Sequence, residues 1–499
     1  MKSAADFPFV VRSRRAAYMS VIGVIILTLV AGLAVPYVFG HAEETRRVNA
    51  ASSPSASPGD ASGGGALGSS EAGLQSDGVT TSSVGPSALG QAPGGAAVLS
   101  VPGSVPPGAG VPGITGREIR VGIPIFDLGT RIPIPGINPD EQRAQWSSYI
   151  VAANKNVGAG GHQLRPVFQG YNPLVADSFR SACLALTQDT QVFAVLAYGL
   201  FDEQVPCFAR EHGVPVVNGI GVSDATMASS GARVLTVSIG KDRALRNHAL
   251  ELQDLGVLKN KRVGILTSTD RNDNAAVDAA LVPTLRRLGV TIAHYSNLSS
   301  DQTTALAQLP IESRQMQASG VNLVFLDANL LLSGYFIQHS DEQGFHPLYT
   351  TSDFEQLVQD GVTNPFPQGF DRAIGVTVLR TGEQRAGQPE PAFDKHCREI
   401  YQAASGAKYQ RGDLQYETTA GICSVVDIAA KALAAAGAAP TRASFMTAAE
   451  SLKNFELGYS ERGSFAPGKH DAPQSIRLAR WSFDCKCWKP TGPFHPARA

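Results

Sequence analysis

The clearest pattern in the chain is an alternation of apolar residues that begins near residue 119. Ile119, Val121, Ile123 and Ile125 occupy every second position, which is the period of a β-strand. Stretches with a helical period then alternate with short apolar runs. The expected strands are 119–125, 164–168, 192–198 and 214–217, and the expected helices are 140–156, 177–188 and 203–212. Alternating strands and helices predict a parallel sheet with helices on both faces.

A second series of the same kind starts near residue 262. Residues 120–123 and 262–265 both read Arg-Val-Gly-Ile, and each copy opens a run of strands and helices. The expected strands are 263–267, 291–295, 321–326 and 347–349, and the expected helices are 275–288, 304–319 and 331–343. Three helices (391–404, 415–436 and 442–452) and two strands (463–465 and 475–481) follow. The repeated order predicts an α/β protein with two similar lobes.

The N-terminal region has a different pattern. Residues 16–40 carry no charge and follow several basic residues, so they predict a transmembrane anchor of about 37 Å with residues 1–15 in the cytoplasm. The alternative is a signal peptide cleaved after Ala42, which would give a secreted protein. No cysteine precedes Cys183, so a lipid-modified N-terminal cysteine is not available.

A segment of small residues separates this apolar run from the folded part. Between residues 51 and 100, 36 of 50 residues are Ala, Gly, Ser or Pro, and such a composition cannot bury enough apolar surface to offset chain entropy. We therefore expect residues 41–116 to form a disordered tether. The chain as a whole has 42 basic and 43 acidic residues, and this balance disfavours binding to nucleic acid.

Six cysteines in an exported chain allow up to three disulfides. Cys183 and Cys207 lie on successive predicted helices, as do Cys397 and Cys423, so each pair can bridge two helices. The last two cysteines form a Cys-x-Cys pair that could close a tight ring, pair with another chain or bind a metal. We expect no metal site, because no second pair of ligands stands near them.

Five short segments keep the order and spacing of a known family. They are 119–125, 211–217, 261–266, 463–465 and 468–471. Over residues 117–489 the chain resembles the leucine/isoleucine/valine-binding branch of the type I periplasmic binding proteins, which are solute receptors of ABC transporters.

The resemblance implies two Rossmann-like lobes with parallel sheets. The chain of such proteins crosses between the lobes three times, here near residues 238–241, 378–381 and 454–458. Lobe 1 would then hold residues 117–238 and 379–452, and lobe 2 would hold residues 239–378 and 453–490.

Ligand-binding loops are expected at the carboxyl ends of the strands, where helix N-termini present free N–H groups. The candidates from the first lobe are Asp127, Tyr198, Gly199, Leu200, Phe201, Gly221 and Ser223. In the second lobe the resemblance points to the positions of a ligand-contacting tyrosine and of an acid that holds the ligand ammonium. At the tyrosine position this chain has Asp270, Arg271 and Asn272, and at the acid position it has Ser352 and Asp353. Asn329 is a further candidate.

This chain departs from the family pattern at several of these positions. The hydroxyl residues that hold the ligand carboxylate in relatives are replaced by Gly199 or Leu200 and by Val222. Together with Tyr198 and Phe201, this favours a ligand with an apolar or aromatic part over a plain branched-chain amino acid. The two aromatic side chains could instead pack under a loop.

No motif argues for catalysis. The chain lacks a phosphate-binding Gly-x-x-x-x-Gly-Lys-Ser/Thr loop and a His-Glu-x-x-His motif, so we expect no enzyme activity and no cofactor. The leading hypothesis is a membrane-tethered, extracytoplasmic solute-binding protein that binds an amino-acid-like, aromatic or amide solute by lobe closure and delivers it to an ABC permease. The alternative is a sensory or scaffolding ectodomain of the same fold, which signals to a protein partner and could form a homodimer through lobe 1.

Overall fold

The computed structural model describes residues 110–127, 138–156, 158–172, 175–269, 273–411 and 413–499. The predicted anchor (16–40) and most of the predicted tether (41–116) lie outside the described residues. Strand β1 (Ile114–Thr115) pairs with the start of the next strand. The folded part therefore begins a few residues earlier than residue 117, where the composition alone placed it.

The first sheet has five parallel strands in the order β3-β2-β4-β5-β6, and β1 runs antiparallel to β2. The strands are β2 (Glu118–Phe126), β3 (Gln163–Tyr171), β4 (Ala194–Ala197), β5 (Val216–Asn218) and β6 (Val234–Thr236). The chain passes from β3 across β2 to β4. The crevice between the carboxyl ends of β2 and β4 is thus the switch point at which open α/β sheets bind ligands.

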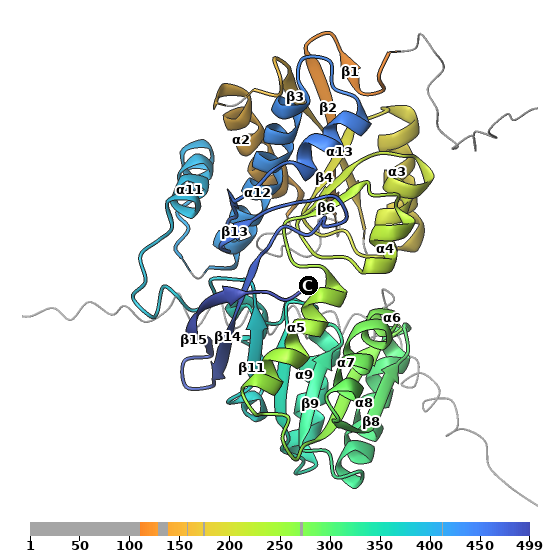
Figure 1. Cartoon of the computed structure of the whole chain (residues 1–499), viewed down its shortest axis with the longest axis vertical. Coiled ribbons are helices and arrows are strands. Elements are labelled where there is room, and N and C mark those ends of the chain that lie inside the picture. The colour runs from red at the N-terminus through yellow and green to blue at the C-terminus, as the bar shows by residue number, and fades with distance from the viewer. Residues whose placement is uncertain (1–109, 128–137, 157, 173–174, 270–272, 412) are drawn as a thin grey trace, which may run out of the picture. The chain divides into compact units, whose positions relative to one another are not determined.

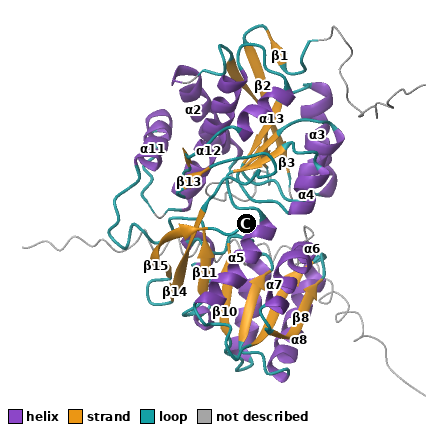
Figure 2. Ribbon diagram, in the orientation of Figure 1, coloured by secondary structure: helices purple, strands orange, loops and turns teal. Residues whose placement is uncertain are grey.

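Helices cover both faces of this sheet (Figures 1 and 2). The alternating residues of β2 that were expected to be buried, Ile119 to Ile125, are at most 1% exposed and pack on one helical layer. That layer is α2 (Pro139–Asn156), α12 (Leu414–Ala436) and α13 (Arg442–Glu450), and the other is α3 (Ala176–Leu184), η2 (Ala185–Asp189) and η3 (Cys207–Glu211). Helix α12 is apolar and long enough to cross a membrane, but 72% of its most apolar window is buried, as in a core helix. We call this sheet with its helices lobe 1.

The second sheet has five parallel strands in the order β8-β7-β9-β10-β11, extended by the antiparallel strands β14 and β15. The strands are β7 (Arg262–Ser268), β8 (Thr291–Leu298), β9 (Leu323–Asp327), β10 (Leu348–Ser352), β11 (Ile374–Thr377), β14 (Ser475–Ser482) and β15 (Cys487–Pro496). One face carries α5 (Lys241–Asp254), α6 (Asp273–Ala276), η5 (Val277–Leu281) and α7 (Val282–Arg287), and the other carries α8 (Gln302–Ala318) and α9 (Leu330–Glu342). We call this part lobe 2. The prediction of an α/β fold with two parallel sheets is confirmed.

The chain crosses between the lobes three times. The first crossing joins β6 to α5, and the second leads from β11 to α11 (Ala392–Ser405), which packs on α2. After α13, the short strands β12 (Phe455–Glu456) and β13 (Arg462–Gly463) pair with each other, and residues 455, 457, 465 and 472 pack in the core of lobe 1. The third crossing therefore lies just before Ser475, later along the chain than residues 454–458, where the resemblance placed it.

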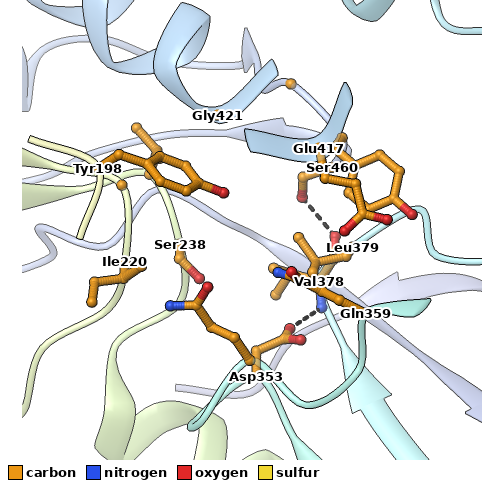
Figure 3. Close-up of a pocket in the computed structure, with 15 residues that line it drawn as sticks. Tyr198, Ile220, Ser238, Asp353, Gln359, Val378, Leu379, Glu417, Gly421 and Ser460 are labelled. Carbon is orange, nitrogen blue, oxygen red and sulfur yellow. Dashed lines mark hydrogen bonds between the residues drawn. The ribbon is translucent and has the colours of Figure 1, made fainter. Parts of the chain in front are cut away.

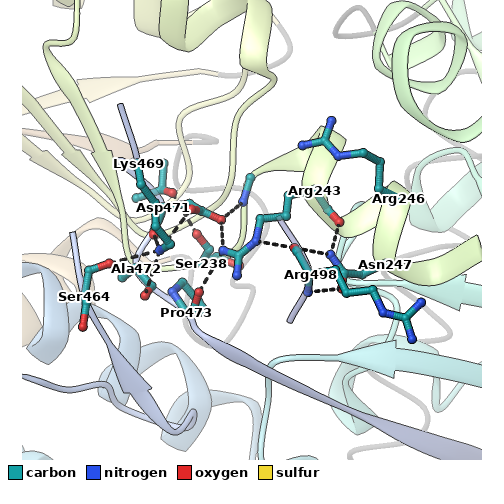
Figure 4. A network of polar contacts seen from close by, with 12 residues as sticks. Ser238, Arg243, Arg246, Asn247, Ser464, Lys469, Asp471, Ala472, Pro473 and Arg498 are labelled. Carbon is teal, nitrogen blue, oxygen red and sulfur yellow. Dashed lines mark hydrogen bonds and ion pairs between the residues drawn. The ribbon is translucent and has the colours of Figure 1, made fainter. Parts of the chain in front are cut away.

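A buried polar network ties the first crossing to the third (Figure 4). The Nη1 atom of Arg243 on α5 lies 2.7 Å from Oδ2 of Asp471 and donates to the carbonyl of Pro473. The N–H of Gly240 donates to the same carboxylate oxygen. Burial opposes ionisation of Asp471, but Arg243 and Lys469 hold its pKa below the usual value. The two chain segments between the lobes are thus fixed to each other by charge as well as by backbone.

Three disulfides stabilise the fold. They join Cys183 to Cys207, Cys397 to Cys423 and Cys485 to Cys487. The first connects α3 with η3 and the second connects α11 with α12, which are the bridges between helices that the sequence predicts. The third closes a tight ring at the turn between β14 and β15, one of the alternatives that the sequence left open.

Candidate functional site

A cavity of about 40 Å³ lies where the lobes and the crossings meet (Figure 3). Its wall comes from loops at the carboxyl ends of β4, β5 and β6 in lobe 1 and of β10 and β11 in lobe 2, from α12, and from residues 458–460. The space is close to the roughly 30 Å³ that one water molecule occupies in the liquid. A larger solute can therefore enter only if the wall moves.

Tyr198 follows β4 directly and enters the cavity from lobe 1. Its ring lies against two glycines: an added Cβ would stand 2.4 Å from its Cδ2 at Gly219 and 2.2 Å from its Cε2 at Gly421. Neither position therefore accepts a side chain while the ring stays in place. Burial and the nearby Glu417 raise the pKa of Tyr198, so its hydroxyl stays protonated.

Asp353 follows β10 and enters the cavity from lobe 2. Its Oδ1 accepts a hydrogen bond from the Thr377 hydroxyl at 2.7 Å, and its Oδ2 accepts one from the Val378 N–H at 2.5 Å. Burial raises the pKa of Asp353 to about 7, although both hydrogen bonds favour the ionised form. The group thus titrates near neutral pH.

A second carboxyl, that of Glu417, enters the cavity from the first turn of α12. The residue is 3% exposed, and neither carboxyl oxygen accepts a hydrogen bond of ordinary geometry from a described residue. Burial raises its pKa to about 8, although the hydroxyl of Tyr459 is close enough to lower it somewhat. The cavity therefore holds two carboxyls, one from each lobe, that keep their protons more readily than exposed acids do.

The second crossing and residues 458–460 form the floor between these two groups. The hydroxyl of Ser460 donates to the carbonyl of Val378 at 2.6 Å, and the N–H of Arg380 donates to the carbonyl of Tyr459. Asp353 thus binds a strand that is itself paired with the segment carrying Tyr459. Hydrogen bonds therefore connect Asp353 through the second crossing to the segment that carries Tyr459.

A separate buried ion network also joins the lobes. Lys241, the first residue of α5, places its Nζ 2.9 Å from Oδ2 of Asp202 in lobe 1 and 2.7 Å from Oδ1 of Asp273 in lobe 2. All three residues are at most 4% exposed. Burial alone would lower the pKa of Lys241, but the two carboxylates raise it above its usual value. The lysine therefore stays charged between the two lobes.

Comparisons with known proteins identify the fold. No protein-family model matches the chain, and no curated protein sequence matches it. A leucine-binding protein from Thermotoga maritima superposes with a TM-score of 0.57 at 13% identity, over 75% of this chain and 98% of that protein. The chain has the type I periplasmic binding protein fold.

Other solved structures with the type I periplasmic binding protein fold give the same result. A solute-binding protein of an ABC transporter from Rhodopseudomonas palustris, in complex with 4-hydroxybenzoate, gives a TM-score of 0.60 at 13% identity, over 77% of this chain and 98% of that one. A fatty acid ABC transporter substrate-binding protein from Thermomonospora curvata gives 0.59 at 14% identity, over 78% and 95%. These identities are low, so the likeness concerns the fold.

Among the described candidates from the sequence, Tyr198 and Asp353 line the cavity. Leu200 instead lies in the core of lobe 1, where its backbone N–H and carbonyl bind the side chain of Asn218. Ser223 caps helix α4 (Asp224–Ser229), and its hydroxyl donates to Asp202. Leu200 and Ser223 therefore help to hold the loops after β4 and β5 in place.

The remaining candidates have structural contacts of their own. Asn329 is the N-cap of α9, and Ser352 accepts a hydrogen bond from the Phe354 N–H. Gly199 packs closely on Phe126, and Gly221 packs closely on the Ile239 carbonyl. The backbone N–H groups of Asp127 and Phe201 donate to Tyr171 and Gln204. Asp270, Arg271 and Asn272 lie outside the described residues.

Sequence reasoning missed the residues that α12 and residues 458–460 contribute. Glu417 and Gly421 stand four residues apart, so they share one face of α12. A carboxyl and a glycine at this spacing in an otherwise apolar helix were the available signal. The apolar character of the helix hid it, because that pattern also describes an ordinary core helix.

Proposed function

We propose that the chain is the extracytoplasmic solute-binding protein of an ABC transporter, which closes its lobes on a small solute. The observation that supports this function is the cavity whose wall is drawn from both lobes and from two crossings. A solute bound there would contact both lobes at once. It would therefore bind the closed arrangement more tightly than an open one, which is the condition for driving closure.

The proposal includes the attachment and the partners expected from the sequence. Residues 16–40 would anchor the protein in the membrane with residues 1–15 in the cytoplasm, and residues 41–116 would act mainly as the tether. The folded part would deliver an amino-acid-like, aromatic or amide solute to a permease. The neighbours in fold, which are solute-binding proteins rather than enzymes by their names, support a binding role.

A thermal-shift experiment on the full chain in detergent micelles tests this function. The panel contains amino acids, amides, aromatic acids and amines. A solute at 100 times its Kd should stabilise the native state by about 2.7 kcal/mol. Asp353→Ala should abolish the rise in Tm, whereas Asp189→Ala, at an exposed site outside the cavity, should preserve it.

The sensory or scaffolding alternative has one observation in its favour. The cavity of about 40 Å³ is far below the roughly 300–1,000 Å³ of ordinary small-molecule sites. A receptor that stays closed and signals to a protein partner would need no more room. A flat response of the folded chain to the whole panel would select this alternative and exclude solute delivery.

A further inference from the structure

The ionisable acids on the cavity wall have no basic side chain beside them on that wall. Among the described residues that line the cavity, Asp353 and Glu417 carry carboxyls, and none is a lysine or an arginine. The buried Lys241 is held by Asp202 and Asp273 outside this wall. Arg385 acts on Glu417 from outside this wall, but its guanidinium is paired with Asp360. A solute carboxylate would thus meet two acids and no described cation on the wall itself.

Glu417 is the less satisfied of the two groups. It is 3% exposed, and in the described part of the chain neither of its oxygens accepts a hydrogen bond of ordinary geometry, although the Tyr459 hydroxyl is close enough to lower its pKa. A buried polar atom left unpaired costs about 1–3 kcal/mol, and an unpaired buried charge costs more. A cationic donor in the cavity would supply the missing hydrogen bonds, and its charge would favour the ionised form of a carboxyl that otherwise keeps its proton.

Asp353 has acceptor capacity left for the same cation. Each of its oxygens accepts one hydrogen bond, from Thr377 or from Val378, whereas an ionised carboxylate offers about four acceptor sites. The existing bonds fix the orientation of the carboxyl. One free acceptor site therefore remains on each oxygen.

The rest of the wall suits an organic cation. Tyr198 and Tyr459 offer aromatic rings, whose faces attract cations, and Ile220 and Val237 offer apolar surface for a carbon skeleton. An ammonium group has three N–H donors and is about the size of a water molecule, which matches the present space of about 40 Å³.

We propose that the cavity binds the ammonium group of an organic amine that carries no carboxylate, held between Asp353 and Glu417 (Figure 3). This inference rests on the proposed solute-binding function and names its ligand class. The solute donates hydrogen bonds to one carboxylate from each lobe, so its charge draws the lobes together. An amino acid fits poorly, because its own carboxylate would lie near these acids.

Calorimetric titration of the full chain in detergent micelles with matched probes tests the proposal. Isoamylamine and leucine differ by one carboxylate, as do phenethylamine and phenylalanine, and isoamyl alcohol is the neutral control. At least one amine should bind tenfold or more tightly than its matched amino acid and than the alcohol. Glu417→Gln should weaken amine binding at least tenfold, Glu417→Asp should retain most of it, and Asp427→Asn on the same helix should leave it unchanged.

The outcomes separate this inference from the function on which it rests. Binding of an amino acid as tight as that of its amine, or amine binding unchanged by Glu417→Gln, overturns the amine assignment and leaves the solute-binding function standing. An equal affinity for isoamyl alcohol also overturns it, because the carboxyls would then act as neutral donors. If no probe and no member of the wider panel binds to a chain with a normal unfolding transition, both proposals fail.

Discussion

At the scale of single residues, the shape of the cavity depends on two glycines that have no side chain as well as on the side chains that line it. Tyr198 can lie over α12 because Gly219 and Gly421 have no side chain. The ring lies close enough to Glu417 for that carboxyl to raise the pKa of Tyr198. The lack of a side chain at Gly421 therefore helps to shape the cavity, because it leaves room for the Tyr198 ring.

Gly421→Ala tests this dependence. Alanine favours a helix interior by about 1 kcal/mol over glycine, but its Cβ would stand 2.2 Å from Cε2 of Tyr198. Overpacking of this kind costs about 1–3 kcal/mol, so the variant should unfold at lower urea concentration despite the better helix propensity. In a Tyr198→Ala background the same substitution should be neutral or stabilising. Equal destabilisation in both backgrounds would show that the ring is not the obstacle.

The raised pKa values of the two carboxyls predict how stability varies with pH. Above about pH 5 the unfolded chain has released the protons of Glu417 and Asp353, whereas the folded state keeps the proton of Asp353 up to about pH 7 and that of Glu417 up to about pH 8. Each group therefore lowers stability by about 1.4 kcal/mol per pH unit as pH rises through its own range. Glu417→Gln should remove one such slope, measured by urea unfolding at several pH values. Tyr459, Asp360 and Arg385 face this carboxyl and stay in place in the variant.

Glu399→Gln serves as the control for this pH profile. Glu399 lies on an exposed face of α11, and the substitution should leave the wild-type slope unchanged. A variant at Glu417 with the same slope as the wild-type protein would mean that this carboxyl is ionised in the folded state at neutral pH.

At the scale of elements, the sequence predicts strands and helices better than it predicts their ends and contacts. The alternation of Ile119 to Ile125 marks β2 because these side chains share one face of the strand and are buried there against α2, α12 and α13. Strand β15 escaped prediction because Pro490, Pro493 and Pro496 interrupt it. Proline is tolerated there because β15 is the edge strand, where a missing N–H costs no ladder bond.

The cavity was harder to predict than the fold for a physical reason. A loop at the end of a strand can be found from the sheet topology, which located Tyr198, and the family resemblance pointed to Asp353. Whether a polar side chain in such a loop points to a solute or holds its own backbone depends on contacts between distant residues. Ser223 and Asn329 both turned out to be helix caps, and the buried partner Glu417 comes from a helix more than 200 residues after β4.

The disulfides give an element-scale prediction. The bridges Cys183–Cys207 and Cys397–Cys423 close loops of 24 and 26 residues, so replacing either pair by alanine should cost about 3 kcal/mol. The ring at Cys485–Cys487 spans a separation of 2 residues and should contribute about half as much by the same reasoning. Urea unfolding of the three double variants under oxidising conditions measures the ranking. Equal losses for all three would contradict a chain-entropy origin.

At the scale of the whole molecule, ion pairs of differing burial join α5 to lobe 1, and burial should decide how much each contributes to holding the lobes. Lys241 contacts Asp202 with both side chains at most 4% exposed, whereas Arg246 contacts Asp224 at 3.3 Å with the side chains 28% and 59% exposed. The exposed pair is screened by water and contributes at most about 1 kcal/mol. The buried lysine neutralises two aspartates that have little access to water, so its loss leaves their charges uncompensated.

Lys241→Met should therefore destabilise the folded protein by about 3–5 kcal/mol, because methionine fills a similar volume but leaves Asp202 and Asp273 unpaired. Arg246→Met should cost less than about 1 kcal/mol. Urea unfolding of both variants measures the contrast, and faster hydrogen exchange in the loop carrying Asp202 would show that the contact between the lobes has opened. Costs below 1 kcal/mol for both variants would refute the buried lysine as the link, and the polar network of Arg243 and Asp471 would then be the element that holds the two lobes together.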